Sequence, residues 1–235
     1  DAVTDTAFII ENQIIEGPSF QHRDTVNVNC AKNIVLKKGT PRYLKKINGS
    51  VASLLTGGAG NHNYFHWMFD VLPRLEILNK SNIVQDIDYY LLPNINKKFQ
   101  KDSLDLLEID EDKRLSSLSY RHISANTIVT VDHPYVLKND ATNEIQNIPL
   151  WISQWLRKSF LINIKKNNQL PKKIYISRKD TSSDLRKVIN ESEVMNLLKK
   201  NDYISVVLSE LKLIDQINLF YNAESIVGLH GAGFA

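Results

Sequence analysis

This chain of 235 residues is poor in cysteine, in long apolar segments and in net charge. Cys30 is the single cysteine, which excludes an internal disulfide framework and a zinc cluster built on cysteines, and favours a reducing compartment. No run of about 18 apolar residues is present, and the first residues lack a signal-peptide pattern. The formal charge is only +3. Dedicated nucleic-acid binders concentrate positive charge on one face, so we expect no nucleic-acid partner.

The remaining composition is that of a soluble globular protein, with 43% hydrophobic and 23% charged residues. The length is sufficient for one large or two small domains, each with its own core. The chain starts at Asp1 rather than at a methionine and stops soon after an apolar run. We therefore expect that both ends are cut.

The most distinctive segment is NHNYFHWMFDVLPRLEIL, residues 61–78. Its apolar residues leave no clean polar face, which predicts a helix buried on most sides. The polar exceptions are spaced by three, four and four positions and therefore form one stripe: Asn63, His66, Asp70 and Arg74. An unpartnered buried polar group costs roughly 1–3 kcal/mol. The stripe must therefore either be satisfied internally or line a cleft.

Two features flank this stripe. Pro73 removes a backbone hydrogen bond from the helix, which predicts a kink between Phe69 and Pro73. The segment 56–63 before the helix is a glycine loop that ends in cap-type residues. Such a loop suits close approach of a ligand to the backbone, which favours the cleft interpretation.

The rest of the chain reads as strands and helices. Short β-type runs in residues 1–56 predict an antiparallel N-terminal layer, at 8–10, 13–15 and 33–36. Further strands are expected at 89–92, 123–131, 173–177, 203–208 and 225–229, and helices at 97–107, 149–165, 192–200 and 211–222. Alternation at this spacing is typical of right-handed βαβ units and a parallel sheet, so the predicted fold class is α/β.

Arginines follow one of these strands. Arg178 comes directly after the strand that ends at Ser177, and Arg186 closes the polar loop beyond it. Doubly wound sheets bind ligands at the carboxyl ends of their strands, and a guanidinium matches phosphate oxygens. Two arginines around one loop therefore favour a diphosphate ligand. The alternative is a loop held by salt bridges of Asp180 and Asp184.

Two further motifs lie near strand ends. Asn190 and Glu193 fit a capping box at the start of a helix, which would suffice to explain Glu193. The run Gly228–Gly233 follows the last strand, and its small residues allow backbone N–H groups to approach an anion. His230, within this run, either contacts a ligand or packs in the core.

Carboxylate pairs give no convincing metal site. The Asp-x-Asp pattern at 86–88 precedes its strand, and the one at 110–112 lies in a charged turn. A metal-bound diphosphate requires carboxylates at the carboxyl end of a strand. We interpret both pairs as surface groups and expect no divalent metal. The sequence also contains no Walker-type lysine loop and no nucleophile elbow.

Three blocks of this sequence together resemble the family-61 glycosyltransferases. They are NYFHWMFDVLPR at 63–74, YISR at 175–178 with Arg186, Asn190, Glu191 and Glu193, and GLHGAG at 228–233. The resemblance implies a GT-B-like fold, two facing Rossmann-like domains with a cleft between them. It also implies a nucleotide-sugar donor and transfer with inversion at the sugar carbon.

On this resemblance, residues 1–148 form an acceptor-side α/β domain with a β-rich N-terminal layer. Residues 149–235 form the nucleotide-sugar-binding Rossmann-like domain. The family typically continues past the histidine and glycine block, so we expect the second domain to be truncated.

The resemblance also suggests roles for individual residues. Asp70 is the expected base on the acceptor hydroxyl, and His66 orients or replaces it. Arg74 braces Asp70, and Asn63 belongs to the same acceptor-side group. The donor-binding residues are Arg178, Arg186, Asn190, Glu191, His230, Gly231, Ala232 and Gly233. The arginines would neutralise the diphosphate, which makes a metal dispensable, and Glu191 would hold ribose or sugar hydroxyls.

Two other functions stay open: a polysaccharide pyruvyltransferase on a similar scaffold, and a non-catalytic glycan- or nucleotide-binding module. The composition, rich in Lys, Asn and Ile, favours a bacterial member of the family that works in capsule or cell-surface polysaccharide synthesis. The acceptor would be a glycan or a lipid-linked glycan. We accordingly expect a cytoplasmic protein and leave peripheral association with the inner face of the plasma membrane open.

Overall fold

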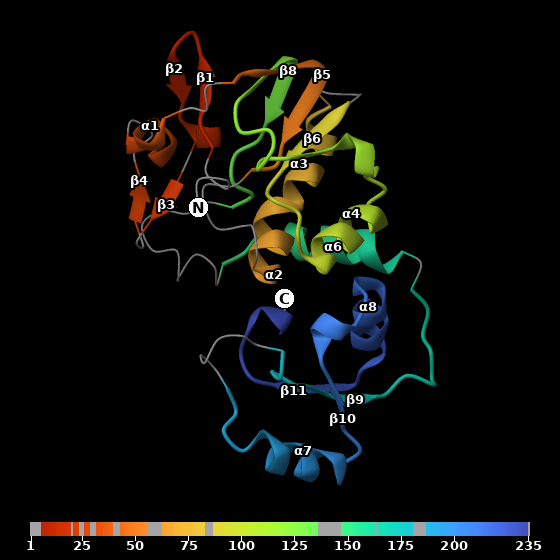
Figure 1. The fold of residues 1–235 in the computed structure, drawn as a ribbon. Coiled ribbons are helices and arrows are strands. Elements are labelled where there is room, and N and C mark those ends of the chain that lie inside the picture. The colour runs from red at the N-terminus through yellow and green to blue at the C-terminus, as the bar shows by residue number, and fades with distance from the viewer. Residues whose placement is uncertain are drawn as a thin grey trace. The chain divides into compact units, whose positions relative to one another are not determined.

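The computed structural model describes residues 6–19, 21–23, 26–28, 32–39, 43–55, 63–82, 87–135, 147–162, 164–180 and 187–234. The chain is a mixed α/β protein with parallel sheets (Figure 1). It divides into two compact units, Asp1–Lys97 with Glu108–Leu156, and Lys98–Leu107 with Arg157–Ala235. The assignment of 1–148 and 149–235 to two functional domains stays a prediction. No helix among the described residues is long and apolar enough to cross a membrane.

The first unit is built on a parallel sheet in the order β7-β6-β5-β8. The strands are β5 (Lys45–Ser53), β6 (Tyr89–Leu92), β7 (Arg114–Ser116) and β8 (Ile123–Thr130). Val51, Leu91 and Leu115 from three of these strands pack in one buried cluster. The expectation of an antiparallel layer up to residue 56 is therefore wrong for 45–53, which forms a central parallel strand. The strand is exposed at Lys45, Lys46 and Asn48 and buried only at 51–53, so its sequence shows neither a regular polar alternation nor a continuous apolar run.

The expected N-terminal hairpins are present: β1 (Phe8–Ile10) pairs with β2 (Gln13–Ile15), and β3 (Gln21–Arg23) pairs with β4 (Val26–Val28), both antiparallel. The prediction of a third strand at 33–36 is wrong, because Ile34–Lys38 forms the helix α1. Asn33 begins this helix by accepting a hydrogen bond from the Val35 N–H on Oδ1. Its Nδ2 donates to the carbonyl oxygens of Thr6 and Ser19, both at 2.9 Å. One buried amide thus joins three chain segments.

Replacing Asn33 by alanine is expected to lower the free energy of unfolding by about 3 kcal/mol. The change removes a helix cap, worth about 1 kcal/mol, and leaves two carbonyl groups without their donor at a fully buried side chain. Urea denaturation of the variant measures the loss. Asn48→Ala, at an exposed position of β5, is the control and should change the value by less than about 0.5 kcal/mol. A similar loss in both variants would contradict the role of Asn33.

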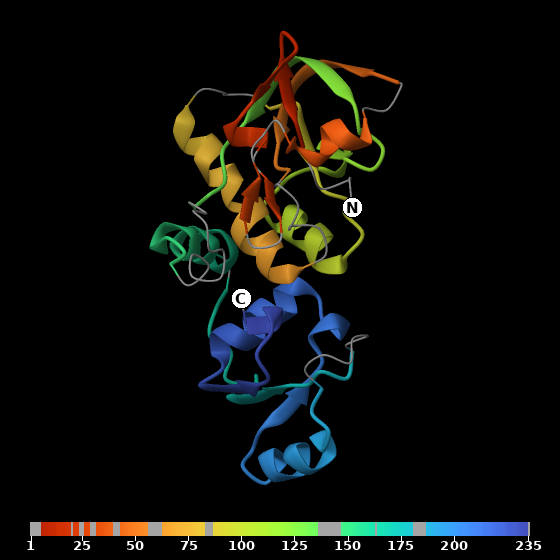
Figure 2. The ribbon, with the colours of Figure 1, turned by 90° about the vertical axis from the view of Figure 1, so that its left-hand side faces the viewer.

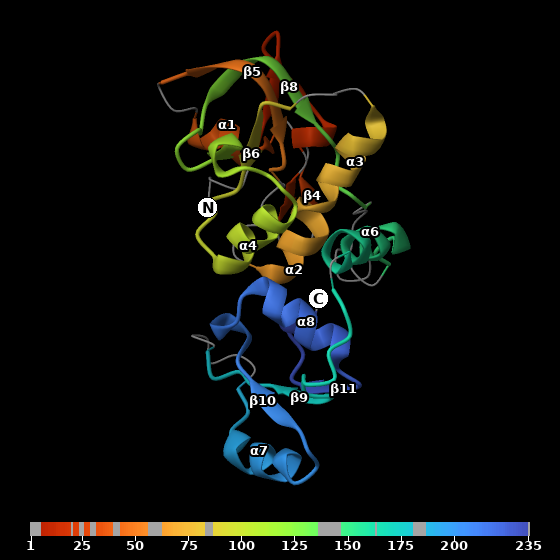
Figure 3. The ribbon, with the colours of Figure 1, turned by 90° about the vertical axis from the view of Figure 1, so that its right-hand side faces the viewer.

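The aromatic segment forms α2 (Tyr64–His66), a π turn η3 (Trp67–Val71) and α3 (Pro73–Ser81), which follow one another in a continuous ribbon (Figure 3). Within the turn, the Leu72 N–H donates to the Trp67 carbonyl, five residues earlier, at 3.1 Å. Pro73, the next residue, has no backbone N–H to donate, and the wider π turn accommodates the missing hydrogen bond. The distortion expected before Pro73 is thus a π turn. Trp67, Val71 and Leu72 are fully buried, which confirms the prediction of a helix buried on most sides.

The second unit contains a parallel sheet in the order β10-β9-β11. Its strands are β9 (Lys173–Ile176), β10 (Ile204–Val206) and β11 (Ser225–Gly228), and its helices include α4 (Lys98–Leu106), α7 (Glu191–Lys199) and α8 (Leu213–Asn222). α7 and α8 lie on opposite faces of the strands (Figures 1 and 2). Asp102 of α4 accepts a hydrogen bond from the Leu213 N–H at 2.9 Å and so caps α8. α6 (Leu150–Leu161) spans the division between the units.

Candidate functional site

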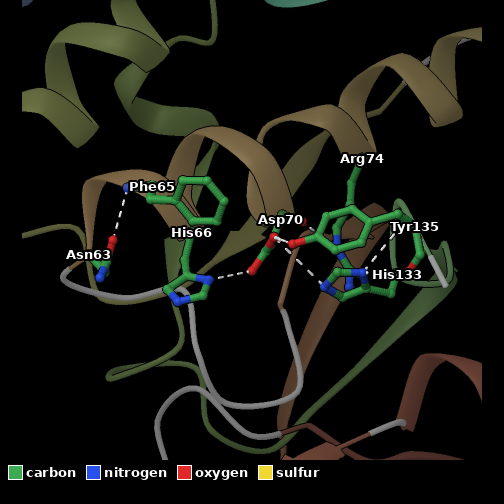
Figure 4. A network of polar contacts seen from close by, with 7 residues as sticks. All are labelled: Asn63, Phe65, His66, Asp70, Arg74, His133 and Tyr135. Atoms are coloured by element: carbon green, nitrogen blue, oxygen red, sulfur yellow. Dashed lines mark hydrogen bonds and ion pairs between the residues drawn. The ribbon is translucent and has the colours of Figure 1, made fainter. Parts of the chain in front are cut away.

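Asp70 is a buried member of the polar stripe; it lies in the π turn, and the residue is only 2% exposed. His66 Nδ1 lies 2.7 Å from Asp70 Oδ2, and the Tyr135 hydroxyl donates to Oδ1 at 2.6 Å (Figure 4). His133 Nε2 lies 3.9 Å from the same Oδ1. Each carboxylate oxygen therefore has a close polar partner from the chain itself.

The charge of Asp70 follows from these contacts. Burial by itself raises the pKa of this carboxyl, but the nearby His133 and the hydrogen-bonded His66 outweigh it and hold the pKa well below the usual range. An ionised carboxylate can only accept hydrogen bonds, so His66 must carry a proton on Nδ1. In a neutral His66 the other ring nitrogen, Nε2, then has its lone pair free to take a proton.

His66 is placed at the edge of this network. Its side chain is 25% exposed, whereas that of Asp70 is 3% exposed. The Phe65 ring packs edge-on against the His66 ring, with centroids 5.5 Å apart, and stacks on Phe69 at 4.8 Å. Asn63 caps the helix by accepting from the Phe65 N–H at 2.9 Å. The histidine is thus fixed by a carboxylate and an aromatic ring on a capped helix.

Arg74 supports Asp70 through the backbone and not through the carboxylate. Its Nε donates to the Asp70 carbonyl at 3.1 Å, and Nη1 donates to the Val131 carbonyl at 2.8 Å. Burial lowers the pKa of Arg74 to about 10, against the opposing charges of Asp70 and Asp132. Arg74 thus ties the π turn to the end of β8, and its bracing of Asp70 for catalysis stays a prediction.

Sequence reasoning missed Tyr135 and His133. Both lie just beyond β8, far along the chain from Asp70, and their pairing with it depends on the parallel sheet. His133 Nδ1 lies 2.9 Å from the Tyr135 carbonyl, and the two rings pack edge to face at 4.5 Å. Burial, followed by the charge of Asp70, raises the pKa of Tyr135 far above its usual value, so its hydroxyl remains a donor. The available signal was their position after a strand's carboxyl end.

In the second unit, Glu191 organises the carboxyl end of β9. Its Oε1 accepts from the Tyr175 hydroxyl at 3.0 Å, the Ser177 hydroxyl at 2.9 Å and the Arg178 N–H at 3.2 Å. Partial burial raises the pKa of Glu191, but these three hydrogen bonds outweigh it and lower the pKa. Burial and Glu191 in turn raise the pKa of Tyr175 to about 12. One carboxylate oxygen of Glu191 is thus engaged within the chain.

The predicted capping box at α7 is wrong. The Asn190 side chain makes no hydrogen bond to the helix backbone, and its Nδ2 donates to Glu193 Oε2 at 3.2 Å. The two side chains pair with each other because Asn190 does not adopt the extended backbone of a regular cap, with φ −107° and ψ 40°.

The two predicted phosphate-binding elements meet within the second unit. β9 and β11 are neighbours, and the Arg178 guanidinium packs against Gly231. His230 is exposed, and Ala232–Phe234 forms a 3₁₀ turn directly beyond it. Arg186 lies outside the described residues, as does the glycine loop 56–62. Within the described ranges, no group of three or more His, Cys, Asp or Glu side chains could hold a metal ion.

Comparison with known proteins gives similar vertebrate proteins. The chain matches vertebrate proteins called EGF domain-specific O-linked N-acetylglucosamine transferase, with 30% identity over 77 residues for those of Canis lupus familiaris and Gallus gallus. The match covers 31% of this chain but only 15% and 14% of those relatives. The model of the family Glycosyltransferase 61 matches residues 64–235, from the first residue of α2 onward. The chain therefore belongs to the glycosyltransferase 61 family.

Proposed function

We propose that this protein is an inverting glycosyltransferase in which His66 is the base that activates the acceptor hydroxyl. The observation that carries this proposal is the 2.7 Å contact between His66 Nδ1 and the buried, ionised carboxylate of Asp70. The family match favours sugar transfer over the two alternatives, a pyruvyltransferase and a non-catalytic binding module.

The proposed reaction is a single displacement. The acceptor oxygen forms a bond to the anomeric carbon while the bond from that carbon to the phosphate oxygen breaks. The acceptor proton moves to His66 Nε2, and the nucleoside diphosphate leaves with the bonding electron pair. Asp70 holds His66 in the tautomer with Nδ1 protonated and stabilises the imidazolium that forms. Attack from the face opposite the leaving group inverts the configuration of the sugar carbon.

This assignment of roles differs from the prediction made from the sequence, in which Asp70 is the base. A carboxylate whose two oxygens accept from His66 and Tyr135, and whose pKa is lowered, is a weak proton acceptor. His66 is more exposed and keeps one nitrogen for the substrate. Asp70 is accordingly a positioning residue in the proposal, and Tyr135 fixes its other oxygen.

The donor side of the proposal rests on the second unit. Arg178, with Arg186, would bind the diphosphate and stabilise the charge on the leaving group, so the mechanism requires no divalent metal. Backbone N–H groups of 230–233 would add donors. Asn190 and the second oxygen of Glu191 would hold ribose or sugar hydroxyls. The GT-B arrangement, with acceptor and donor bound by separate domains, is part of this proposal.

The substrates are proposed by class. The vertebrate relatives are named for transfer of N-acetylglucosamine to EGF domains, so donors of this sugar are the first to test. A role in capsule or cell-surface polysaccharide synthesis, with a glycan or lipid-linked glycan acceptor, stays a prediction, as does a cytoplasmic location.

A donor screen tests the proposed activity. A nucleotide sugar at a hundred times its dissociation constant should stabilise the chain by about 2.7 kcal/mol, measured as a thermal shift. Phosphoenolpyruvate is the matched comparison and should give no shift. With the donor identified, proton NMR of the product should show an anomeric configuration opposite to that of the donor. Retention of configuration, or a shift with phosphoenolpyruvate alone, would contradict the proposal.

A further inference from the structure

Gly231 and Arg178 are brought together by the register of the second sheet. Gly228 of β11 pairs with Ile176 of β9, and the two strands run parallel. Arg178 lies two residues beyond Ile176, and Gly231 lies three residues beyond Gly228. The carboxyl ends of the two strands thus place the guanidinium beside the glycine.

The Arg178 guanidinium fills the space that a side chain at position 231 would occupy. A Cβ added to Gly231 would collide with Arg178 Nη1 and would lie 3.7 Å from Cζ of the same guanidinium. The backbone of Gly231 is not in the left-handed region, so its conformation does not require glycine. A side chain at 231 would therefore displace the mobile end of Arg178, whereas glycine leaves the guanidinium in its place.

The other end of Arg178 is fixed independently. Its backbone N–H donates to Glu191 Oε1 at 3.2 Å, and the same oxygen accepts from Ser177 and Tyr175. Arg178 is half-buried. Glu191 therefore fixes the backbone at which the Arg178 side chain starts, and the guanidinium lies in the space beside Gly231.

We propose that Gly231 is a positioning residue for Arg178, and that this pair binds the diphosphate of the donor. This inference rests on the proposed function and adds a positioning role for Gly231. Because Gly231 has no side chain, the Arg178 guanidinium can lie beside it. In this position its N–H donors face two phosphate oxygens of the donor. A displaced guanidinium keeps its charge but loses this alignment, and bidentate recognition depends on geometry as well as charge.

Calorimetric titration of the full chain with inorganic pyrophosphate tests the inference. Gly231→Ala should weaken binding about tenfold and Arg178→Ala about 10–100-fold, because hydrogen bonds to charged groups contribute that much to affinity. Lys212→Ala removes an exposed cation of the same unit and should leave binding within about twofold. The thermal midpoint of Gly231→Ala should stay near that of the wild type, since the obstructing atom is the mobile end of a side chain.

The double variant Arg178→Ala/Gly231→Ala separates positioning from a direct or structural role. It should bind no more weakly than Arg178→Ala alone, because the alanine at 231 then has no guanidinium to displace. An equal loss from Gly231→Ala in both backgrounds, or no loss in the wild-type background, would overturn the inference while leaving the proposed function intact. A wild-type chain that binds neither pyrophosphate nor a nucleoside diphosphate would overturn both.

Discussion

Replacing His66 by asparagine is expected to lower kcat for sugar transfer by about 10²–10⁴-fold, the usual contribution of a general base. Asparagine can keep the hydrogen bond to Asp70 Oδ2, because its Nδ2 replaces the Nδ1 of the histidine. It lacks the second ring nitrogen that would take the acceptor proton. The variant therefore removes the base while keeping its contact with Asp70. Steady-state kinetics with the donor found in the screen measure the loss, and KM for the donor should change little.

Two comparisons make this result specific. His122→Gln changes a half-buried histidine at the opposite end of β8, whose carbonyl accepts from the Lys45 N–H, and should leave kcat within about twofold. His66→Ala removes the ring entirely, and added imidazole should restore part of its activity. A His66→Asn variant that keeps wild-type kcat would exclude His66 as the base.

Asp70→Asn is expected to lower kcat by as much as about 10⁴-fold, although no atom of Asp70 is proposed to touch substrate. The change replaces an acceptor of two hydrogen bonds by an amide that also donates. His66 can then carry its proton on Nε2 instead of Nδ1. In that tautomer Nε2 has no lone pair to accept the acceptor's proton, and the imidazolium also loses its counter-charge. The same measurement in Asp88→Asn, an exposed carboxylate of the first unit, is the control.

Two readouts distinguish positioning from a role as base. If Asp70 acts through His66, the variant His66→Asn/Asp70→Asn should be no slower than the slower single variant, and additive losses would contradict this. Stability against acid gives the second readout. Because the folded-state pKa of Asp70 is lowered, its ionised form contributes stability above about pH 4 that is lost as the pH falls toward the folded-state pKa. Asp70→Asn should lack this part of the acid dependence.

Local patterns succeeded where burial is periodic and the segment is long enough. The strand 89–92 and the helix expected at 97–107 correspond to β6 and α4. The later alternation corresponds to β9, α7, β10, α8 and β11 within one or two residues at most ends. Such elements are encoded by their own apolar spacing. Two predictions failed where distant contacts decide the conformation: the nine-residue strand β5 and the short segment 33–36. Asn33 shows this, since its amide joins Thr6, Ser19 and Val35 and fixes a helix where the residues suggested a strand.

The candidate site divides in the same way. His66 and Asp70 could be found from the sequence because a helix places residues four apart on one face. Tyr135 could not, because only the parallel pairing of β5 with β8 brings the chain after β8 to the π turn. The direction of the Asp70 pKa depends on this packing too, since His133 comes from the same segment.

The sequence by itself determined the family, the α/β class and the polar stripe, because each depends on residue types at fixed local spacing. Tertiary structure alone decided that Asp70 also meets Tyr135 and His133, and that Arg178 rests on Gly231. These contacts join residues distant along the chain, and strand pairing sets their distances. Burial and hydrogen bonding then determine which group keeps its proton, and local spacing contains no information on either.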